Sequence, residues 1–466
     1  MTPYPKRLLE TTAETAQQQA SGTLMSRDEA QRLIQRITAM SQADEIQVNV
    51  TSGTQTNIRF ADNRISTAGS VQNNGLGIQS AFGAKSAVVA TNDMSDAGLE
   101  RAVRQSEALA RLAPNNPEAM PALGAQEYSS PRAFFTSVSE LSAAARAEAA
   151  RVAIDLAKAG GDLKAAGFIQ ANASASALGN NKGMFAYHPQ TNVNYTLTVR
   201  TTDGTGSGWA GVDDRDWNRI DFQGVARTAI EKARMSQNPV AIEPGRYTVI
   251  LEPQAVADLV SLLAFALDAR SADEGRSAFS KQGGGTKIGE KIADERITLI
   301  SDPTDPMLLT QPYDGQGLPL GRQVWVENGV LKNLFYSRFW AQKQGKPVTG
   351  APTSVKMMGG DATLEQMIAS TERGILITRL WYLRQVDPRT ILYTGLTRDG
   401  TFLVENGKIA RSVRNFRFNE SPLFMLNNVE MIGRGIRISG AEGGGSMVMP
   451  SMKVRDFNFT SLSEAV

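Results

Sequence analysis

The first half of the sequence contains one order of elements twice: a helix, a set of antiparallel strands and a second helix. In the first copy, a capping box at Ser26–Glu29 opens the first helix, and helical spacing of apolar residues predicts the second over 96–112. In the second copy, the two helices are predicted over 138–159 and 223–236. The repetition predicts one N-terminal α+β domain of pseudo-repeated design over 26–238.

Alternation of apolar and polar residues between these helices predicts short strands. In the first copy the strands are expected near 46–50, 58–60, 75–81 and 86–91, with a turn at Thr51–Gln55 between the first two. In the second copy they are expected near 165–176, 183–188, 193–201 and 208–212. Each copy also carries a predicted Asn-Asn turn, at Asn73–Gly75 and at Asn180–Gly183.

The composition changes after a linker at 239–244. Beyond one apolar helix, most of the second half consists of short strand patterns separated by glycine turns. The Asn-Gly pairs at 328–329 and 406–407 are typical of tight hairpins in which both central residues have positive φ. The pattern predicts a mostly antiparallel, barrel-like β domain over 244–466.

The apolar helix in this second half is predicted over 254–269, and a polar, glycine-rich loop follows over 270–289. A buried helix that ends in an exposed loop is a common place for an active site. This helix, however, carries one continuous apolar stripe, made of Val256, Leu259, Val260, Leu263 and Leu267. The stripe indicates a core helix with no catalytic side chain.

The chain has one histidine, His188, and no cysteine among its 466 residues. The lack of cysteine excludes disulfides, iron–sulfur clusters and thiolate zinc sites, and a site with two imidazoles cannot form within one chain. His188 stands at a strand end before a proline, where we expect a structural role rather than that of a catalytic base. Lys and Arg (49) nearly balance Asp and Glu (47), so no direct binding of nucleic acid is expected.

Residues 1–25 are polar and rich in Gln, Ala and Thr, which predicts a flexible N-terminal arm. The arm has no apolar core of signal-peptide length, and no stretch of the chain approaches 18 apolar residues. We therefore expect a cytoplasmic protein with no membrane partner. Whether a leader precedes this sequence stays open.

Five segments, taken in order, resemble the TldD/PmbA (TldE) family. They are Asn57–Arg64, Pro244–Pro253, Ser277–Ser280, Val326–Asn333 and Phe402–Ile409. None is specific alone, but the ordered set covers nearly the whole chain. The family has two kinds of subunit. The TldD kind resembles a zinc peptidase, with a His-Glu-x-x-x-His helix and a downstream cysteine as ligands. The PmbA/TldE kind lacks these ligands and pairs with a catalytic subunit.

The resemblance places the six positions of the metal motif on 260–265. Val260, Ser261 and Phe265 then stand where the catalytic subunits have His, Glu and His. A catalytic zinc needs three protein ligands and a nearby carboxylate, which isopropyl and phenyl groups cannot supply. The resemblance implies that these are vestigial metal-site positions. It implies no cofactor in this chain and zinc only in a catalytic partner subunit.

The loop after the helix holds a second set of candidate residues, namely Asp273, Glu274, Arg276 and Ser277. Paired carboxylates can do acid–base work when burial separates their pKa values. A polar, glycine-rich loop with interleaved arginines instead favours a solvated ion-pair surface, so we interpret this segment as a possible groove or interface loop. The acidic turn Asp302–Asp305 could hold a hard cation such as calcium, although two Asp-Pro steps are commoner as loop structure.

Two functional hypotheses follow. The resemblance implies a non-catalytic TldE/PmbA-like subunit of a TldD/TldE-type zinc peptidase assembly, which acts on unfolded peptides and pairs with a zinc-bearing TldD-like subunit. Such a chain is expected to have no catalytic activity alone. The alternative is a homodimeric protein that binds a peptide or small ligand and has no peptidase partner.

Overall fold

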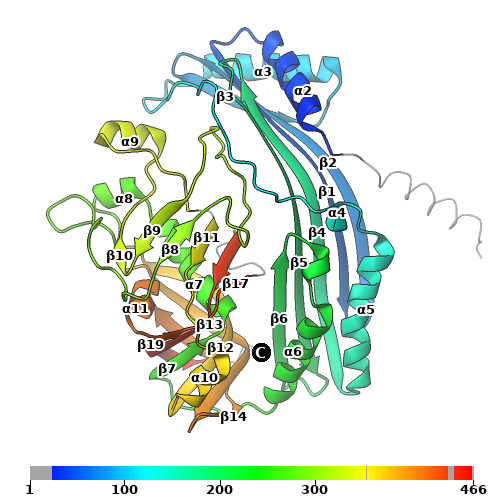
Figure 1. Cartoon of the computed structure of the whole chain (residues 1–466), viewed down its shortest axis with the longest axis vertical. Coiled ribbons are helices and arrows are strands. Elements are labelled where there is room, and N and C mark those ends of the chain that lie inside the picture. The colour runs from blue at the N-terminus through cyan, green and yellow to red at the C-terminus, as the bar shows by residue number, and fades with distance from the viewer. Residues whose placement is uncertain (1–23, 353, 439–445, 464–466) are drawn as a thin grey trace, which may run out of the picture.

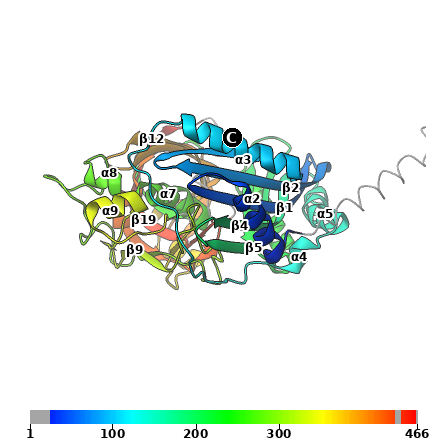
Figure 2. The same ribbon diagram turned by 90° about the horizontal axis from the view of Figure 1, so that it is seen from above.

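The structure is a computed structural model that describes residues 24–352, 354–438 and 446–463. A tall, curved sheet forms the N-terminal part, and the C-terminal domain packs beside it (Figure 1). Seen from above, strands β1, β4 and β5 lie between helix α5 and the C-terminal domain (Figure 2). The arm predicted over 1–25 falls almost wholly outside the described residues.

The N-terminal sheet has six strands in the order β3-β2-β1-β4-β5-β6. Its strands are β1 (Glu45–Ala61), β2 (Arg64–Phe82), β3 (Lys85–Thr91), β4 (Leu163–Asn180), β5 (Phe185–Thr201) and β6 (Ser207–Asp214). The helices of this part are α2 (Arg27–Met40), α3 (Asp96–Leu112), α4 (Thr136–Ser139), α5 (Ala143–Ala159) and α6 (Phe222–Met235). Three strands lie between α2 and α3 and three between α5 and α6, so the predicted pseudo-repeat is confirmed. The copies meet where β1 pairs antiparallel with β4.

Two predicted turns are wrong. Strand β1 runs unbroken through Thr51–Gln55 and pairs there with β4. Residues Asn73–Gly75 lie inside β2, paired with β1. The chain instead reverses between β1 and β2 at Asp62 and Asn63, whose φ angles are 50° and 57°. Both segments are rich in Ser, Thr, Asn and Gly, and this composition mimics a turn because the strands present polar side chains on one face.

The second copy is predicted more closely. The turn at Asn180–Gly183 joins β4 to β5 as predicted, and Gly183 has a φ of 89°, which favours glycine. The strands predicted over 183–188 and 193–201 are, however, one continuous strand, β5. The predicted break falls at Pro189–Asn192, a polar stretch that stays in register with β4.

Helices cover one face of the N-terminal sheet. Helix α5 and helix α6 pack on the second copy around a cluster that includes Ile169, Val193 and Leu197. Helices α2 and α3 pack in the same way on the first copy, against Val48 and Ile78. Each helix begins with a side-chain cap, such as Ser26 on α2 in the predicted capping box. Burial of these aliphatic side chains holds each copy of the repeat together.

The C-terminal domain contains a closed five-strand barrel in which β12, β7, β19, β15 and β13 follow one another and β13 pairs back to β12. The barrel strands are β7 (Arg246–Leu251), β12 (Arg373–Asp387), β13 (Leu392–Glu405), β15 (Phe416–Glu420) and β19 (Met452–Leu462), with β14 (Lys408–Ser412) and β16 (Val429–Ile432) beside them. Strands β7 and β12 are parallel, and the other barrel pairs are antiparallel. The expected α+β class with a barrel-like second domain is confirmed.

A second six-stranded sheet lies beside the barrel in the order β10-β9-β8-β11-β18-β17. Its strands are β8 (Leu299–Ser301), β9 (Gln323–Glu327), β10 (Val330–Leu331), β11 (Ser354–Met357), β17 (Ile436–Arg437) and β18 (Ser446–Met449). The helices are α7 (Pro253–Ala266), α8 (Ala269–Asp273), α9 (Arg338–Gln344), α10 (Leu364–Ala369) and α11 (Pro422–Asn427). Helix α7 therefore ends three residues before the predicted end at 269, and the chain restarts as α8. Both Asn-Gly hairpins have the predicted positive φ angles.

Candidate functional site

The face of the N-terminal sheet opposite the helices is lined by polar side chains. Side chains alternate between the two faces along each strand. On β4, Gln170, Asn172 and Ser174 are half-buried on this face, while the residues between them are alanines packed away from it. Across the β4–β5 pair, Asn172 lies opposite Asn192, and Ser174 lies opposite Gln190. The sheet thus presents rows of amide and hydroxyl groups.

The C-terminal domain closes over the upper part of this polar face. Tyr128 Oη donates to the carbonyl of Gly317 at 2.8 Å, and Gln47 Nε2 donates to that of Gly315 at 3.1 Å. The hydroxyls of Ser176 on β4 and Tyr313 lie 3.0 Å apart. These contacts join the N-terminal part to residues 313–317 and hold its polar sheet face against the C-terminal domain.

A cavity of about 440 Å³ opens on the polar face, which is within the size range of ligand sites. We call it the amide cavity. It is lined by Thr51, Ser52, Gly53, Thr54, Gln55, Val71, Asn73, Gln170, Asn172, Ala173, Ser174, Gln190, Thr191, Asn192 and Arg215. The lining contains many groups that both donate and accept hydrogen bonds, one arginine and no carboxylate. Its formal charge is therefore positive.

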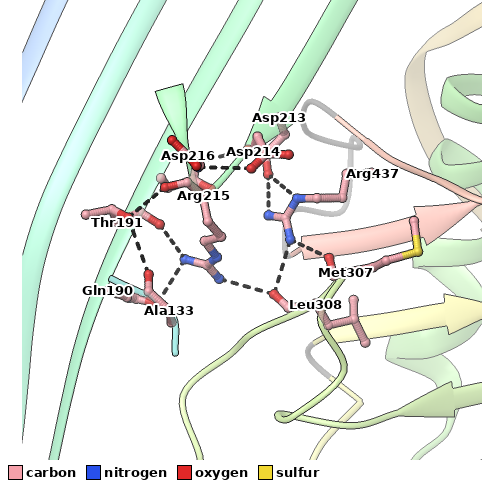
Figure 3. A network of polar contacts seen from close by, with 11 residues as sticks. Ala133, Gln190, Thr191, Asp213, Asp214, Arg215, Asp216, Met307, Leu308 and Arg437 are labelled. Atoms are coloured by element: carbon pink, nitrogen blue, oxygen red, sulfur yellow. Dashed lines mark hydrogen bonds and ion pairs between the residues drawn. The ribbon is translucent and has the colours of Figure 1, made fainter. Parts of the chain in front are cut away.

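Arg215, at the end of β6, enters a polar network at the boundary between the two domains (Figure 3). One guanidinium nitrogen, Nη1, donates to Gln190 Oε1 at 3.2 Å and to the carbonyl of Thr191 at 3.0 Å. The other, Nη2, reaches the carbonyl of Leu308 at 3.5 Å. Arg437 on β17 donates through Nε to Asp213 Oδ1 at 3.2 Å and through Nη1 to the carbonyl of Leu308 at 3.2 Å.

The two arginines differ in their electrostatic surroundings. Arg437 forms an ion pair with Asp213, whose other oxygen accepts from Asn192 at 2.9 Å. Arg215 is only 6% exposed, and burial, reinforced by the charge of Arg437, lowers its pKa to about 10. It still carries its charge at neutral pH. Within the described parts of the chain, no carboxylate forms an ion pair with Arg215.

His188 lies on β5, two residues before Gln190, and only 2% of it is exposed. Burial, with the nearby charge of Arg215, lowers its pKa to about 4, so the ring is neutral at physiological pH. Its Nε2 atom has no hydrogen-bond partner among the described residues. His188 is therefore a buried, neutral residue on the same strand as Gln190, which lines the amide cavity.

Helix α7 does not bring the three vestigial positions together. Val260 and Ser261 are buried in the C-terminal core, and Ser261 Oγ donates to the carbonyl of Asp258 at 3.0 Å. Phe265, near the end of the helix, is 67% exposed. Over the described residues, no group of three His, Asp or Glu side chains is placed to hold a metal. The side chains present at these positions do not fit a zinc ion.

The loop candidates have partners within the C-terminal domain. Asp273 accepts from Trp340 Nε1 at 2.7 Å, and Glu274 forms ion pairs with Arg270 and Arg276. Hydrogen bonds from these arginines lower the pKa of Glu274. Ser277 Oγ accepts from the backbone nitrogen of Phe279 at 3.2 Å. The groove or interface role proposed for this loop stays a prediction.

One further contact ties this loop to the N-terminal part. Arg270 pairs with Glu118 at 2.9 Å, and Glu118 lies in the extended segment after α3. In the acidic turn, Asp305 pairs with Lys356 at 2.7 Å, and Asp302 accepts from the backbone nitrogen of Thr304 at 2.9 Å. These carboxylates are thus used in loop structure.

Arg215 and the amide-bearing residues of β1, β4 and β5 were not predicted from the sequence. Two signals were available. Alternate residues of β4 are Ala or Ile on one side and Gln, Asn or Ser on the other, and Arg215 stands in a charged run, Asp213–Asp216, at a strand end. Neither pattern tells which side of the sheet a second domain covers.

Comparisons with known proteins agree with this architecture. Sequence models described as PmbA/TldA metallopeptidase domain 1, central domain and C-terminal domain match residues 47–110, 134–237 and 244–461. Among the described residues, no helix has the length and apolarity needed to cross a membrane.

Individual relatives match at low identity. A metalloprotease of Methanothermobacter thermautotrophicus is 28% identical over 291 residues, which cover 57% of this chain and 61% of that protein. The metalloprotease PmbA of Escherichia coli O157:H7 is 24% identical over 173 residues, 36% of this chain and 37% of that protein. The matches thus span less than two thirds of these curated relatives.

The solved structure of TldE from Thermococcus kodakarensis has the same fold, with a TM-score of 0.80 at 20% identity over 92% of this chain and 99% of that chain. The three matched domains cover most of the sequence and occur in the order in which the structure builds them. The chain therefore belongs to the PmbA/TldD family.

Proposed function

We propose that this chain is a non-catalytic, TldE/PmbA-like subunit of a TldD/TldE-type zinc peptidase assembly. Its partner is a zinc-bearing, TldD-like subunit, and its own contribution is a polar chamber for unfolded peptide. The observation that carries the proposal is the composition of helix α7. Val260 and Ser261 are buried, and Leu259, Leu262 and Leu263 beside them are aliphatic.

A zinc peptidase site needs imidazole or carboxylate ligands that converge on one point and a base beside the bound water. The chain has no histidine between 189 and 466 and no cysteine, so α7 and its surroundings cannot supply the family's ligand set. Packing of Val260 and Leu263 in the core makes α7 a support for the barrel. Metal chemistry in such an assembly would have to come from another chain.

The amide cavity supports the peptide part of the proposal. An unfolded peptide carries one N–H donor and one carbonyl acceptor on each non-proline residue. Asn and Gln side chains both donate and accept, so rows of them such as Asn172 with Asn192 match a peptide main chain with little dependence on its sequence. The similarity of fold to TldE from Thermococcus kodakarensis supports the same assignment.

Co-expression with a TldD-like subunit from the same genome tests the proposal. We expect the two chains to co-purify, with zinc in the complex and none in this chain purified alone. Cleavage of an unfolded peptide should require both chains and the Glu of the partner's His-Glu-x-x-x-His motif. Stoichiometric zinc in the isolated chain, or proteolysis by it that resists chelators, would contradict the proposal.

A second candidate function is a homodimeric peptide-binding protein without a peptidase partner. The observation that favours it is the amide cavity itself, to which this chain supplies peptide-matching side chains such as Asn172 and Asn192. Light scattering on the isolated chain separates the two cases. A stable dimer that ignores an added TldD-like subunit favours the homodimer, and a dimer that exchanges into a mixed complex favours the assembly.

A further inference from the structure

Among the described residues, no carboxylate accepts a hydrogen bond from the guanidinium of Arg215. In the described structure its acceptors are an amide oxygen and two backbone carbonyls, and its Nε is buried without a hydrogen-bond partner. Buried charges are normally paired, because removing an ion from water costs several kcal/mol. The neighbouring Arg437 follows that rule through Asp213. Among the described residues, Arg215 is thus a buried cation without an ion-pair partner.

The position of Arg215 points to where a counter-ion would come from. Arg215 lines the amide cavity, and the other lining residues are neutral. Gln190, which also lines the cavity, holds Nη1 at 3.2 Å, and the contact of Nη2 with Leu308 is long at 3.5 Å. A carboxylate is a stronger acceptor than a neutral amide and can accept from a guanidinium through both oxygens.

Nearby acidic residues do not remove this deficit. Burial and the charge of Arg437 lower the pKa of Arg215 and the charges of Asp213 and Asp214 raise it, but Asp213 is bonded to Arg437 and Asn192. Asp214 Oδ1 accepts from the backbone nitrogen of Asp216 at 2.9 Å. Asp216 itself accepts from Ser137 and from the backbone nitrogen of Asn218. Each of these carboxylates is thus already bonded to donors other than Arg215.

We infer that Arg215 is the anchor for a carboxylate of the peptide bound in the amide cavity, with Gln190 as the neutral side chain that the carboxylate displaces. The inference rests on the proposed peptide-binding function and adds a substrate class to it. The carboxylate can come from two sources, the free C-terminus of the peptide or an Asp or Glu side chain. The amide rows then hold the main chain while Arg215 sets its register.

Binding of labelled pentapeptides of Ala and Ser to the full-length chain tests the inference by fluorescence anisotropy. The set contains a free C-terminal acid, the same peptide as its C-terminal amide, and amides with one internal Glu or Gln. The free acid is expected to bind about ten- to hundredfold more tightly than the plain amide, because a hydrogen bond to a charged group is worth more than a neutral one. If only the internal Glu restores tight binding, the side chain is the source.

Gln190→Glu is the sharpest variant, since it keeps the shape of the side chain and gives Arg215 a carboxylate from within the protein. We expect it to fold normally and to lose the preference for the acid over the amide. Gln105→Glu, at an exposed position on α3, makes the same change in net charge outside the cavity and should leave the preference unchanged. Arg215→Lys keeps the charge but loses the two-pronged donor and should bind the acid several-fold more weakly.

The outcomes separate this inference from the proposed function. If acid and amide bind equally well, and Gln190→Glu changes neither, the carboxylate anchor is wrong while peptide binding stands. If no peptide binds, the inference fails too, and co-purification with the zinc-bearing subunit decides the proposed function independently. Tight binding of the acid alone that Gln190→Glu abolishes supports the inference.

Discussion

The pKa of His188 reflects how deeply its part of the polar sheet face is buried. It is the only histidine in the chain, and it lies on the polar face of the sheet with its ring almost entirely covered. Its pKa falls to about 4 because burial and the charge of Arg215 both disfavour protonation. The imidazole is therefore neutral in the folded protein, and no sequence pattern around His188 indicates this.

This residue predicts a specific acid sensitivity. An unfolded histidine has a pKa of about 6.5, so between pH 6.5 and 4 the unfolded chain binds a proton that the folded chain does not. Stability should be unaffected by His188 above pH 6.5 and should fall as the pH drops through that window, by about 3 kcal/mol in total. Urea unfolding of the wild type and of His188→Gln from pH 7 to pH 4 measures the difference. Parallel pH profiles for the two proteins would contradict it.

At the scale of single elements, α7 has two environments on one helix. Leu263 is fully buried in the core, whereas Phe265, two residues later, is largely exposed. The helix thus stabilises the C-terminal domain through one side and presents a large apolar side chain at its end. The family's metal motif would need both sides to converge on one ion.

Alanine substitutions on the buried and exposed sides of α7 are expected to lower stability by very different amounts. Leu263→Ala should lower the free energy of unfolding by about 2–5 kcal/mol, because it removes buried methyl groups and leaves a cavity. Phe265→Ala should change it by less than about 0.5 kcal/mol, since the ring is largely solvated. Chemical denaturation of both variants checks this pair. A large loss for Phe265→Ala would show that the ring packs in solution.

The β1–β2 hairpin gives a second prediction for an element. Asn63 has a φ of 57°, its Oδ1 accepts from Ala165 N at 2.7 Å, and its Nδ2 donates to Leu163 O at 2.7 Å. Asn63→Ala should lose both hydrogen bonds and strain the backbone. Asn63→Gly should lose only the hydrogen bonds and be more stable than Asn63→Ala by about 1 kcal/mol. Thermal unfolding of the two variants tests the order, and equal midpoints would argue against backbone strain at this turn.

At the scale of the whole molecule, charged contacts join the two halves of the chain. Arg437 from the second sheet of the C-terminal domain pairs with Asp213 at the end of β6, and both side chains are about 10% exposed. Lys232 on α6 pairs with Glu252 at the start of α7 at 2.6 Å. Through these pairs, the end of β6 and helix α6 are held against the C-terminal domain.

Arg437→Met should therefore destabilise the folded chain by about 3–5 kcal/mol, since it leaves Asp213 as a buried charge without its cation. Arg151→Met, which breaks an exposed ion pair with Glu148 on α5, serves as the matched control and should cost less than about 1 kcal/mol. Denaturation curves for the two variants give the comparison. Equal losses would mean that the boundary pair is hydrated rather than buried.

Much of the fold could be predicted from local pattern. Some features depend only on short-range sequence and can be predicted without tertiary information. They are helix caps such as Ser26, the Asn-Gly hairpins and the repeated order of helices and strands. The strand breaks predicted at Thr51–Gln55 and Asn73–Gly75 failed because polar residues in a strand look like a turn when the face that they line is unknown.

In the functional site, too, some features follow from the sequence alone and others only from the tertiary structure. Ligand chemistry is a matter of composition: a chain with one histidine and no cysteine lacks the family's zinc ligands in whatever way it folds. The amide cavity arises only when β1, β2, β4 and β5 come into register, and Arg215 is buried only where the end of β6 meets Leu308 of the C-terminal domain. Polar alternation along a strand is the same whether that face meets water, a ligand or another domain, so only the packing of distant segments distinguishes them.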